Sequence, residues 1–191
     1  MPQLRLELLG RFRVSLDGTP ITTFESNKVR ALLAYLAVES QRPHPRETLA
    51  TLLWPDWPDR AALSNLRYAL SDLRKVIGDR TAEPPFLLIS REAIQFNTES
   101  DHLLDVAQFI ELTSPGNGDG IGSLEQAVSL YQGEFLEGFS VSEAAPFEDW
   151  SRLKREQLQR VHLQALHKLA AALEVCGELE RALPYARRQI E

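Results

Sequence analysis

Alternating apolar and polar residues at the N-terminus predict a short antiparallel sheet. The stretch LRLELLGRFRVSLDG (residues 4–18) alternates on both sides of Gly10 and ends in Asp17-Gly18, a dipeptide that favours tight hairpin turns. We expect three strands, at residues 4–9, 11–16 and 19–24.

The pattern then changes to the period of about 3.6 residues that marks an amphipathic helix. KVRALLAYLAVE (residues 28–39) places Val29, Leu32, Leu33 and Leu36 on one face. The segment 41–45 ends this helix, because its two prolines supply no backbone N–H to continue it. A second helix is expected over residues 46–54.

A third, longer helix is expected to run to about Ile77, with Asp56 or Asp59 as its N-cap. Gly78 follows at the position where a glycine commonly ends a helix. Beyond it, FLLIS and AIQFN stand on either side of Arg91-Glu92 and predict a hairpin, although no glycine marks the turn.

From Asp101 onward the pattern is almost wholly helical. Helices are expected near residues 103–112, 123–132, 145–175 and 178–190. The glycine-rich stretch SPGNGDGIGS (114–123) and Gly177 separate them, and we interpret the former as a flexible connector. Because the type of secondary structure changes near residues 97–101, we expect two domains, 1–97 and 98–191.

Two different stripes run along the expected third helix when residues are placed about 100° apart. The apolar stripe, which should face the core, consists of Leu63, Leu66, Leu70, Leu73 and Ile77. The second stripe lies about a quarter-turn away and consists of Arg60, Ser64, Arg67, Ser71 and Arg74, with Tyr68 and Lys75 just beyond.

The second stripe has two interpretations. An α-helix fits the major groove of DNA, where Arg and Lys reach phosphates or guanine edges and Ser and Tyr hydroxyls bind backbone oxygens. Alternatively it is a solvated face, with Arg67 and Arg74 paired to acids such as Asp72 or Asp79, and charged faces are usual on exposed helices.

Charge is distributed unevenly along a chain whose formal net charge is −6. Residues 1–97 hold 13 Lys/Arg against 11 Asp/Glu, a net of +2, whereas residues 98–191 hold 8 against 16, a net of −8. This asymmetry suggests different partners for the two halves. A net of +2 is nevertheless too small to indicate DNA binding by itself.

The composition excludes several classes of protein. A content of 43% hydrophobic and 25% charged residues is that of a soluble globular protein, and no apolar run approaches the roughly 20 residues that span a bilayer. A single cysteine allows no internal disulfide, which fits a cytoplasmic location. We find no Walker-type phosphate loop and no metal-ligand spacing among the four histidines, so we expect no metal, no cofactor and no enzyme.

The N-terminal segments also carry a family resemblance. KVRALLAYLA, PRETLATLLWPD and the pattern A-x-x-x-L-R-x-x-L-S-x-L-R-K (Ala62 to Lys75) resemble the winged-helix domain of SARP-type bacterial transcriptional activators, relatives of the OmpR/PhoB fold. This resemblance implies that the long helix recognises DNA through Arg67, Ser71, Arg74 and Lys75, with Arg91 at the tip of the wing. Many members have a glycine-tyrosine pair in the wing, which SREAIQF lacks.

The second half resembles the bacterial transcriptional activator domain of the same family. The resemblance rests on A-x-x-L-Y-x-G-x-F-L (residues 127–136), on Trp150 and on the helix pair that follows. This helix pair is also similar to a tetratricopeptide unit. Such modules bind proteins, so we expect protein contacts or a homodimer, with a purely structural bundle as the alternative. Since no closing helix follows Arg188, we expect the chain to be the N-terminal portion of a longer polypeptide.

The expected fold is therefore an α+β winged helix-turn-helix domain followed by an all-α, tetratricopeptide-like domain. The resemblance implies a bacterial activator that binds double-stranded promoter DNA at repeats and recruits RNA polymerase. The alternative is a protein-interaction adaptor that uses both modules without binding DNA.

Overall fold

A four-stranded sheet begins the chain. In the computed structural model, which describes residues 2–116 and 120–188, the strands lie in the order β3-β2-β1-β7. They are β1 (Leu4–Glu7), β2 (Arg13–Leu16), β3 (Thr19–Pro20) and β7 (His102–Leu104). β1 and β2 are antiparallel, with Leu6 opposite Val14. Asp17 and Gly18 both have positive φ and form the turn expected from the sequence.

Strand β7 corrects one expectation. Its residues were expected to begin a helix at 103, but they extend along β1 as a parallel strand, with Leu104 beside Leu6. The helix α4 (Asp105–Thr113) begins only afterwards. Three residues are too few to show a period, and their strand conformation depends on a partner at the other end of the domain. The division at residue 97 stays a prediction, while the sheet itself contains strands from both sides of it.

Three helices pack against one another and share a hydrophobic core with this sheet: α1 (Asn27–Val38), α2 (Arg46–Leu53) and α3 (Asp59–Val76). The apolar stripe of α3 faces the core as expected, since Leu66, Leu73 and Ile77 have no exposed surface. Gly78 ends the helix with φ +68°.

The expected N-cap of α3 is wrong. The cap residue is Pro58, without any side-chain cap bond, and its carbonyl accepts the backbone N–H groups of Ala61 and Ala62. Asp59 instead occupies the first turn, where a carboxylate stabilises the positive end of the helix dipole.

A second, three-stranded sheet lies beside α2 and has the order β4-β6-β5. Its strands are β4 (His44–Pro45), β5 (Leu87–Ile89) and β6 (Ala93–Phe96). The β5–β6 hairpin is at the place expected from the sequence, with the turn at Ser90 to Glu92. The short β4 was not expected, and its two residues pair with Ile94 and Ala93.

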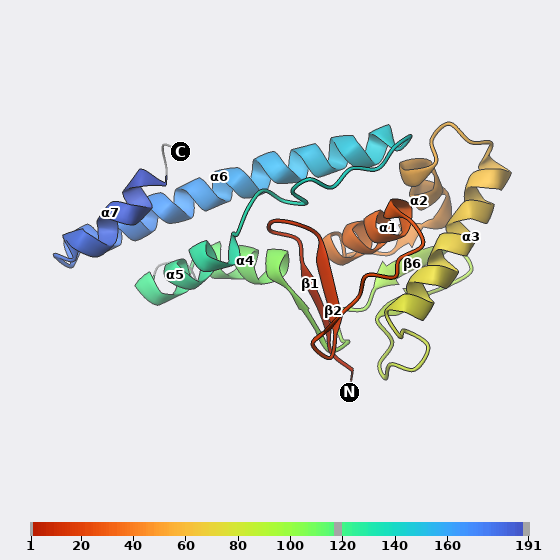
Figure 1. Cartoon of the computed structure of the whole chain (residues 1–191), viewed down its shortest axis with the longest axis horizontal. Helices are drawn as coiled ribbons and strands as arrows, with labels where there is room; N and C mark the ends of the chain where they lie inside the picture. The colour runs from red at the N-terminus through yellow and green to blue at the C-terminus, as the bar shows by residue number, and fades with distance from the viewer. Residues whose placement is uncertain (1, 117–119, 189–191) are drawn as a thin grey trace.

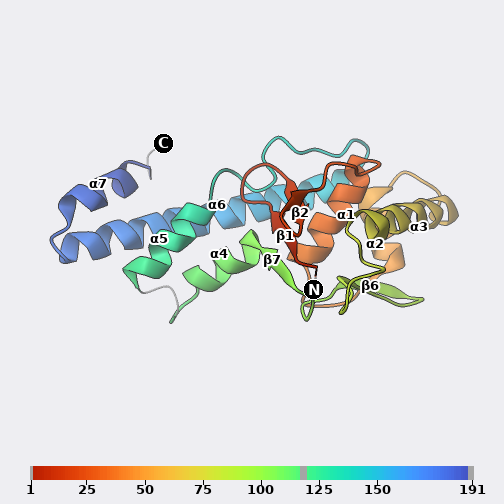
Figure 2. The same cartoon turned by 60° about the horizontal axis from the view of Figure 1, so that its bottom comes forward.

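The C-terminal half is helical and comprises α4, α5 (Ile121–Leu130), α6 (Ala145–Val175) and α7 (Leu179–Arg187). Of these, α5, α7 and the second half of α6 extend away from the sheets, while the first half of α6 lies along α1 and α2 (Figures 1 and 2). Residues 117–119 of the expected connector and 189–190 of the expected last helix lie outside the described residues. In the segments that are described, no helix is both long and apolar enough to cross a membrane.

Helix α6, 31 residues long, belongs to two hydrophobic clusters. Its first half adds Phe147 and Leu158 to the main core, which also holds the sheet and α1 to α3. Its second half adds Leu166 and Leu169 to a smaller cluster with α5 and α7. The winged helix-turn-helix arrangement followed by a helical unit confirms the expected fold class.

Polar contacts join the two halves. The backbone N–H groups of Leu8 and Leu9 donate to one oxygen of Asp105, at 2.7 and 2.8 Å. Burial raises the pKa of Asp105 to about 6, although these donors and the N–H of Val106 favour the ionised form. Glu39, the C-cap residue of α1, accepts a hydrogen bond from the Trp150 indole (2.9 Å) and pairs with Lys154 (2.8 Å), both on α6. We call these contacts the junction.

Candidate nucleic-acid interface

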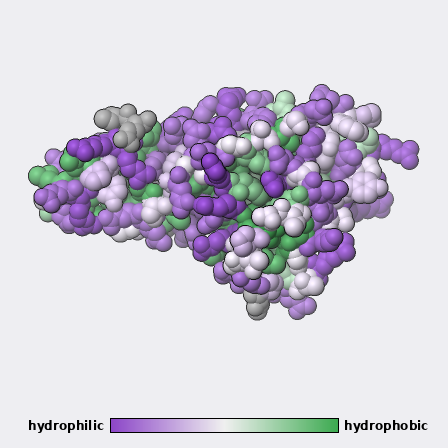
Figure 3. Space-filling model, in the orientation of Figure 1, coloured by the Kyte–Doolittle hydropathy of each residue, from purple (hydrophilic) through white to green (hydrophobic). Residues whose placement is uncertain are grey.

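Helix α3 lies at the end of the molecule opposite α5 and α7, and both views agree on this (Figures 1 and 2). The flank over α3 is mostly hydrophilic, while apolar surface shows nearer the centre of the same face (Figure 3). No described helix of the acidic half covers the outer face of α3 in either view. The stripe that runs beside its buried leucines is therefore open to solvent.

Most of the predicted site residues on α3 are exposed. Tyr68 is 72% exposed, and the other exposed members of the set are Arg60, Arg67, Ser71 and Lys75. Ser64 and Arg74 are half-buried. The exposed hydroxyl and cationic groups thus lie on the outer side of the helix, in the order that the helical period predicted.

Three predicted residues come together in one groove. The groove has a volume of about 470 Å³ and lies where α3, the start of α2 and the β5–β6 hairpin meet. Its walls consist of Arg46, Glu47, Arg60, Leu63, Leu66, Arg67 and Arg91. We call this feature the arginine groove.

The cationic groups of the arginine groove have no ion-pair partner among the described residues. Glu47 is the acidic member of the lining. Like charges gathered in a concave surface produce a positive potential that attracts polyanions. The predicted residues Ser64, Tyr68, Ser71, Arg74 and Lys75 do not line the groove.

Arg46 was missed in the sequence analysis. It is the first residue of α2, and its guanidinium donates from Nε (3.2 Å) and Nη2 (2.9 Å) to the carbonyl oxygen of Ser90 in the hairpin turn. A cation at a helix N-terminus lies at the unfavourable end of the helix dipole. That mismatch was the available signal that Arg46 has a role other than stabilising its helix.

Arg74 differs from the other arginines of the stripe. Its Nε donates to Oδ2 of Asp79 at 2.7 Å, and the Asp79 side chain is fully buried. The other oxygen of Asp79 accepts the backbone N–H of Leu87, which begins β5. Among the residues that the structure describes, the acid-paired interpretation therefore holds for Arg74 but not for Arg67.

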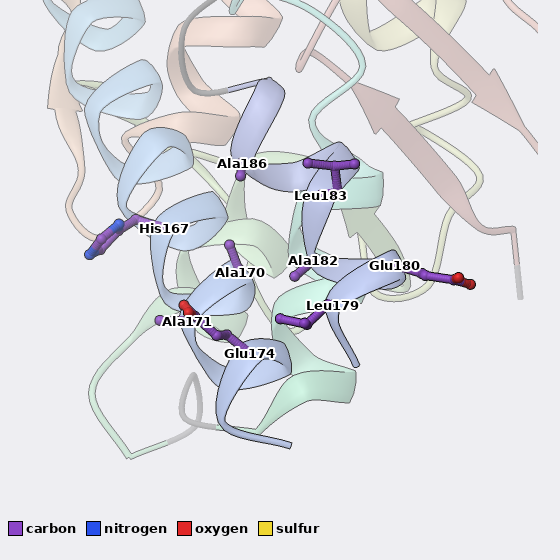
Figure 4. Close-up of a pocket in the computed structure, with 9 residues that line it drawn as sticks. All are labelled: His167, Ala170, Ala171, Glu174, Leu179, Glu180, Ala182, Leu183 and Ala186. Atoms are coloured by element: carbon purple, nitrogen blue, oxygen red, sulfur yellow. The ribbon is translucent and has the colours of Figure 1, made fainter. Parts of the chain in front are cut away.

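A second concave surface lies in the helical half, between α6 and α7 (Figure 4). This hollow of about 640 Å³ is walled by alanines and by Leu179 and Leu183, while Glu180 and His167 point away from it on opposite sides. Apolar walls flanked by carboxylates do not suit a polyanion. The arginine groove is accordingly the candidate interface for nucleic acid.

The helical half matches a known family. Residues 105–191 match the Bacterial transcriptional activator domain family. Over 126 residues, 65% of this chain, the sequence is 31% identical to the Transcriptional regulatory protein EmbR of Mycobacterium tuberculosis. It is also 28% identical over 186 residues to the Regulatory protein AfsR of Streptomyces coelicolor, across 88% of this chain and 18% of AfsR. The match spans only 32% of the length of EmbR.

A solved structure has the same fold. The structure of Mycobacterium tuberculosis EmbR in complex with low affinity phosphopeptide aligns with a TM-score of 0.65 and 22% identity, over 99% of this chain and 59% of that one. Together these matches support the resemblance to SARP-type regulators that the sequence motifs indicated.

Proposed function

We propose that this protein is a transcriptional regulator that binds promoter DNA through its winged helix. The observation that carries the proposal is the arginine groove, in which Arg60 and Arg67 of α3 meet Arg91 of the hairpin and form no ion pair within residues 2–116 and 120–188. The relatives are named regulatory proteins, which agrees with this role. α3 would enter the major groove, with the hairpin beside the neighbouring backbone.

The cationic and hydroxyl groups along α3 make different contacts with DNA in this proposal. Arg60, Arg67 and Lys75 neutralise phosphates or bind guanine edges, and each neutralised phosphate makes the affinity more dependent on salt. The hydroxyls of Ser64, Tyr68 and Ser71 donate to backbone oxygens. Arg74 supports the end of the helix through Asp79.

The acidic half serves a different partner in this proposal. Its apolar hollow between α6 and α7 and its net charge of −8 suit a protein surface better than DNA. By its resemblance to SARP-type activators, we propose that the protein binds direct repeats as two adjacent copies and recruits RNA polymerase. Transcription from a template with selected sites, using purified polymerase, should rise when the protein is added.

The test of DNA binding begins with selection of bound fragments from random DNA. Binding of a selected duplex is then titrated at several salt concentrations. We expect the Arg60→Ala, Arg67→Ala double variant to bind about 100-fold more weakly, since each contact is worth roughly 1–3 kcal/mol. Arg160→Ala is the matched control, because Arg160 is exposed on α6 and has no ion pair among the described residues.

Two outcomes would oppose the proposal. If the folded double variant binds as tightly as the wild type, the site has been assigned to the wrong face. If no selected fragment binds with a steep dependence on salt, the chain acts as a protein adaptor instead.

A further inference from the structure

The turn of the β5–β6 hairpin is built without glycine. The hydroxyl oxygen of Ser90 accepts the backbone N–H groups of Glu92 (3.2 Å) and Ala93 (2.9 Å). The same hydroxyl donates to the carbonyl of Ala93, and the Ser90 N–H binds that carbonyl as well. Side-chain bonds of this kind can replace the special backbone angles that glycine supplies in other turns.

Arg46 holds the same turn from the side of α2. Its guanidinium directs two N–H groups at the Ser90 carbonyl, and its backbone N–H donates to the carbonyl of Glu92 at 3.0 Å. The neighbouring Pro45 pairs with Ala93 across the sheet. Both the main chain and the side chain of Arg46 therefore fix the turn relative to α2.

The side chain at this position is unusual for its surroundings. Arg46 lies at the N-terminus of a helix and lines the same groove as Arg60, Arg67 and Arg91, so its charge is opposed by the helix dipole and by three cations. Only a planar guanidinium can present two fixed donors to one oxygen. The two hydrogen bonds to Ser90 thus account for an arginine at a position that the helix dipole disfavours.

We propose that Arg46 is a positioning residue for Arg91. The residue held by the clamp, Ser90, immediately precedes Arg91 in the chain, so the clamp fixes where the Arg91 side chain meets the arginine groove. Arg46 and Ser90 together hold a turn that contains no glycine. This inference rests on the proposed DNA-binding function.

The experiment measures binding of a selected duplex across a salt series for Arg91→Ala, Arg46→Met, the double variant of these two, and Arg46→Lys. We expect Arg91→Ala to weaken binding about fivefold and to lower the salt slope by about 0.9, the loss of one phosphate contact. Arg46→Met should have the same effect, and the double variant should be no weaker than either single variant. Arg46→Lys keeps the charge but not the two-donor geometry, so it should also bind about fivefold more weakly.

Other results overturn the inference. If the double variant binds DNA about 25-fold more weakly, and its salt slope falls twice as much as in the single variants, Arg46 contacts DNA independently of Arg91. Wild-type affinity in Arg46→Lys means that only its charge matters, and wild-type affinity in Arg91→Ala means that there is no contact to position. Arg67→Ala separates the two proposals, because an unchanged affinity in that variant opposes the binding site itself. Circular dichroism and thermal melting establish that each variant is folded.

Discussion

The arginine groove and the junction use charge in opposite ways. In the groove, four guanidinium groups share a concave surface and none forms an ion pair in the described part of the chain. At the junction, Glu39 forms an ion pair with Lys154 and accepts a hydrogen bond from the Trp150 indole, and Asp105 accepts three backbone N–H groups. A charged group that has partners within the chain is tied to the fold, whereas an exposed charge without an ion pair is available to a binding partner.

Arg74 shows that the difference does not follow from sequence position alone. It belongs to the same helical stripe as Arg67, but its partner is a fully buried carboxylate that also holds the first residue of β5. Like the charged residues of the junction, Arg74 therefore has a partner within the chain and is expected to affect stability more than DNA binding. The following predictions test this division.

The largest effect on stability is expected at Asp105. Replacing it by alanine leaves the backbone N–H groups of Leu8 and Leu9 buried without an acceptor. Each such group costs roughly 1–3 kcal/mol, so we expect Asp105→Ala to lower the free energy of unfolding by about 3 kcal/mol. Urea unfolding monitored by circular dichroism measures this change.

Asp105→Asn is the matched control, because its amide oxygen can still accept both bonds. Since burial raises the pKa of Asp105 to about 6, the folded state keeps the proton at pH values where the unfolded chain has lost it. The stability contributed by this shift is complete below the ordinary pKa of 3.8 and is lost as the pH rises through about 6. The wild type should therefore lose stability relative to Asp105→Asn over this range, and a constant difference would refute the assignment.

A smaller loss is expected at Arg74. Arg74→Ala leaves the buried carboxylate of Asp79 without its cationic partner. Because the Arg74 side chain is 35% exposed, the loss of unfolding free energy should be smaller than for a fully buried pair, at about 2 kcal/mol. Adding Asp79→Asn removes the stranded charge and keeps an acceptor for Leu87, which should restore part of the stability. DNA affinity should change little in the folded variant. A large loss of affinity without a loss of stability would instead place Arg74 among the DNA contacts.

The sequence predicted those features that depend on local periodicity. The long helix α6 and the exposure of Arg60 and Arg67 follow directly from the spacing of apolar residues along one helix. The features it missed depend on distant partners. β7 is a strand because β1 lies beside it, and Arg46 acts on Ser90, 44 positions away.

The choice between Arg67 and Arg74 illustrates the same limit. Both lie on one stripe, and pairing with Asp79 was a stated alternative for each. The chain turns at Gly78, and the N–H of Asp79 then binds the carbonyl of Arg74, which places the carboxylate under the end of the helix. The spacing of residues along the sequence does not predict this turn geometry, so it could not show which arginine pairs with Asp79.

The smallest effect on the free energy of unfolding is expected at His162, a buried polar group that has no hydrogen-bond partner for one ring nitrogen among the described residues. The ring of His162 on α6 stacks on Tyr131 at 4.0 Å, and neither His162 Nδ1 nor the Tyr131 hydroxyl has a hydrogen-bond partner among the described residues. Burial, with a smaller contribution from Arg188, lowers the pKa of His162 to about 4. The folded state thus keeps this ring neutral at pH values where the unfolded chain protonates it.

The stability contributed by neutral His162 is present above its ordinary pKa of 6.5 and is lost as the pH falls toward 4. We expect the wild type to lose about 1.5 kcal/mol relative to His162→Phe between pH 6.5 and 5, at 1.36 kcal/mol per pKa unit. The phenyl ring preserves the stack on Tyr131, and comparing the two proteins cancels the opposite effect of Asp105. Urea unfolding at both pH values measures the difference. An equal pH dependence in the two proteins would mean that the ring is protonated in the folded state and that its burial does not exclude charge.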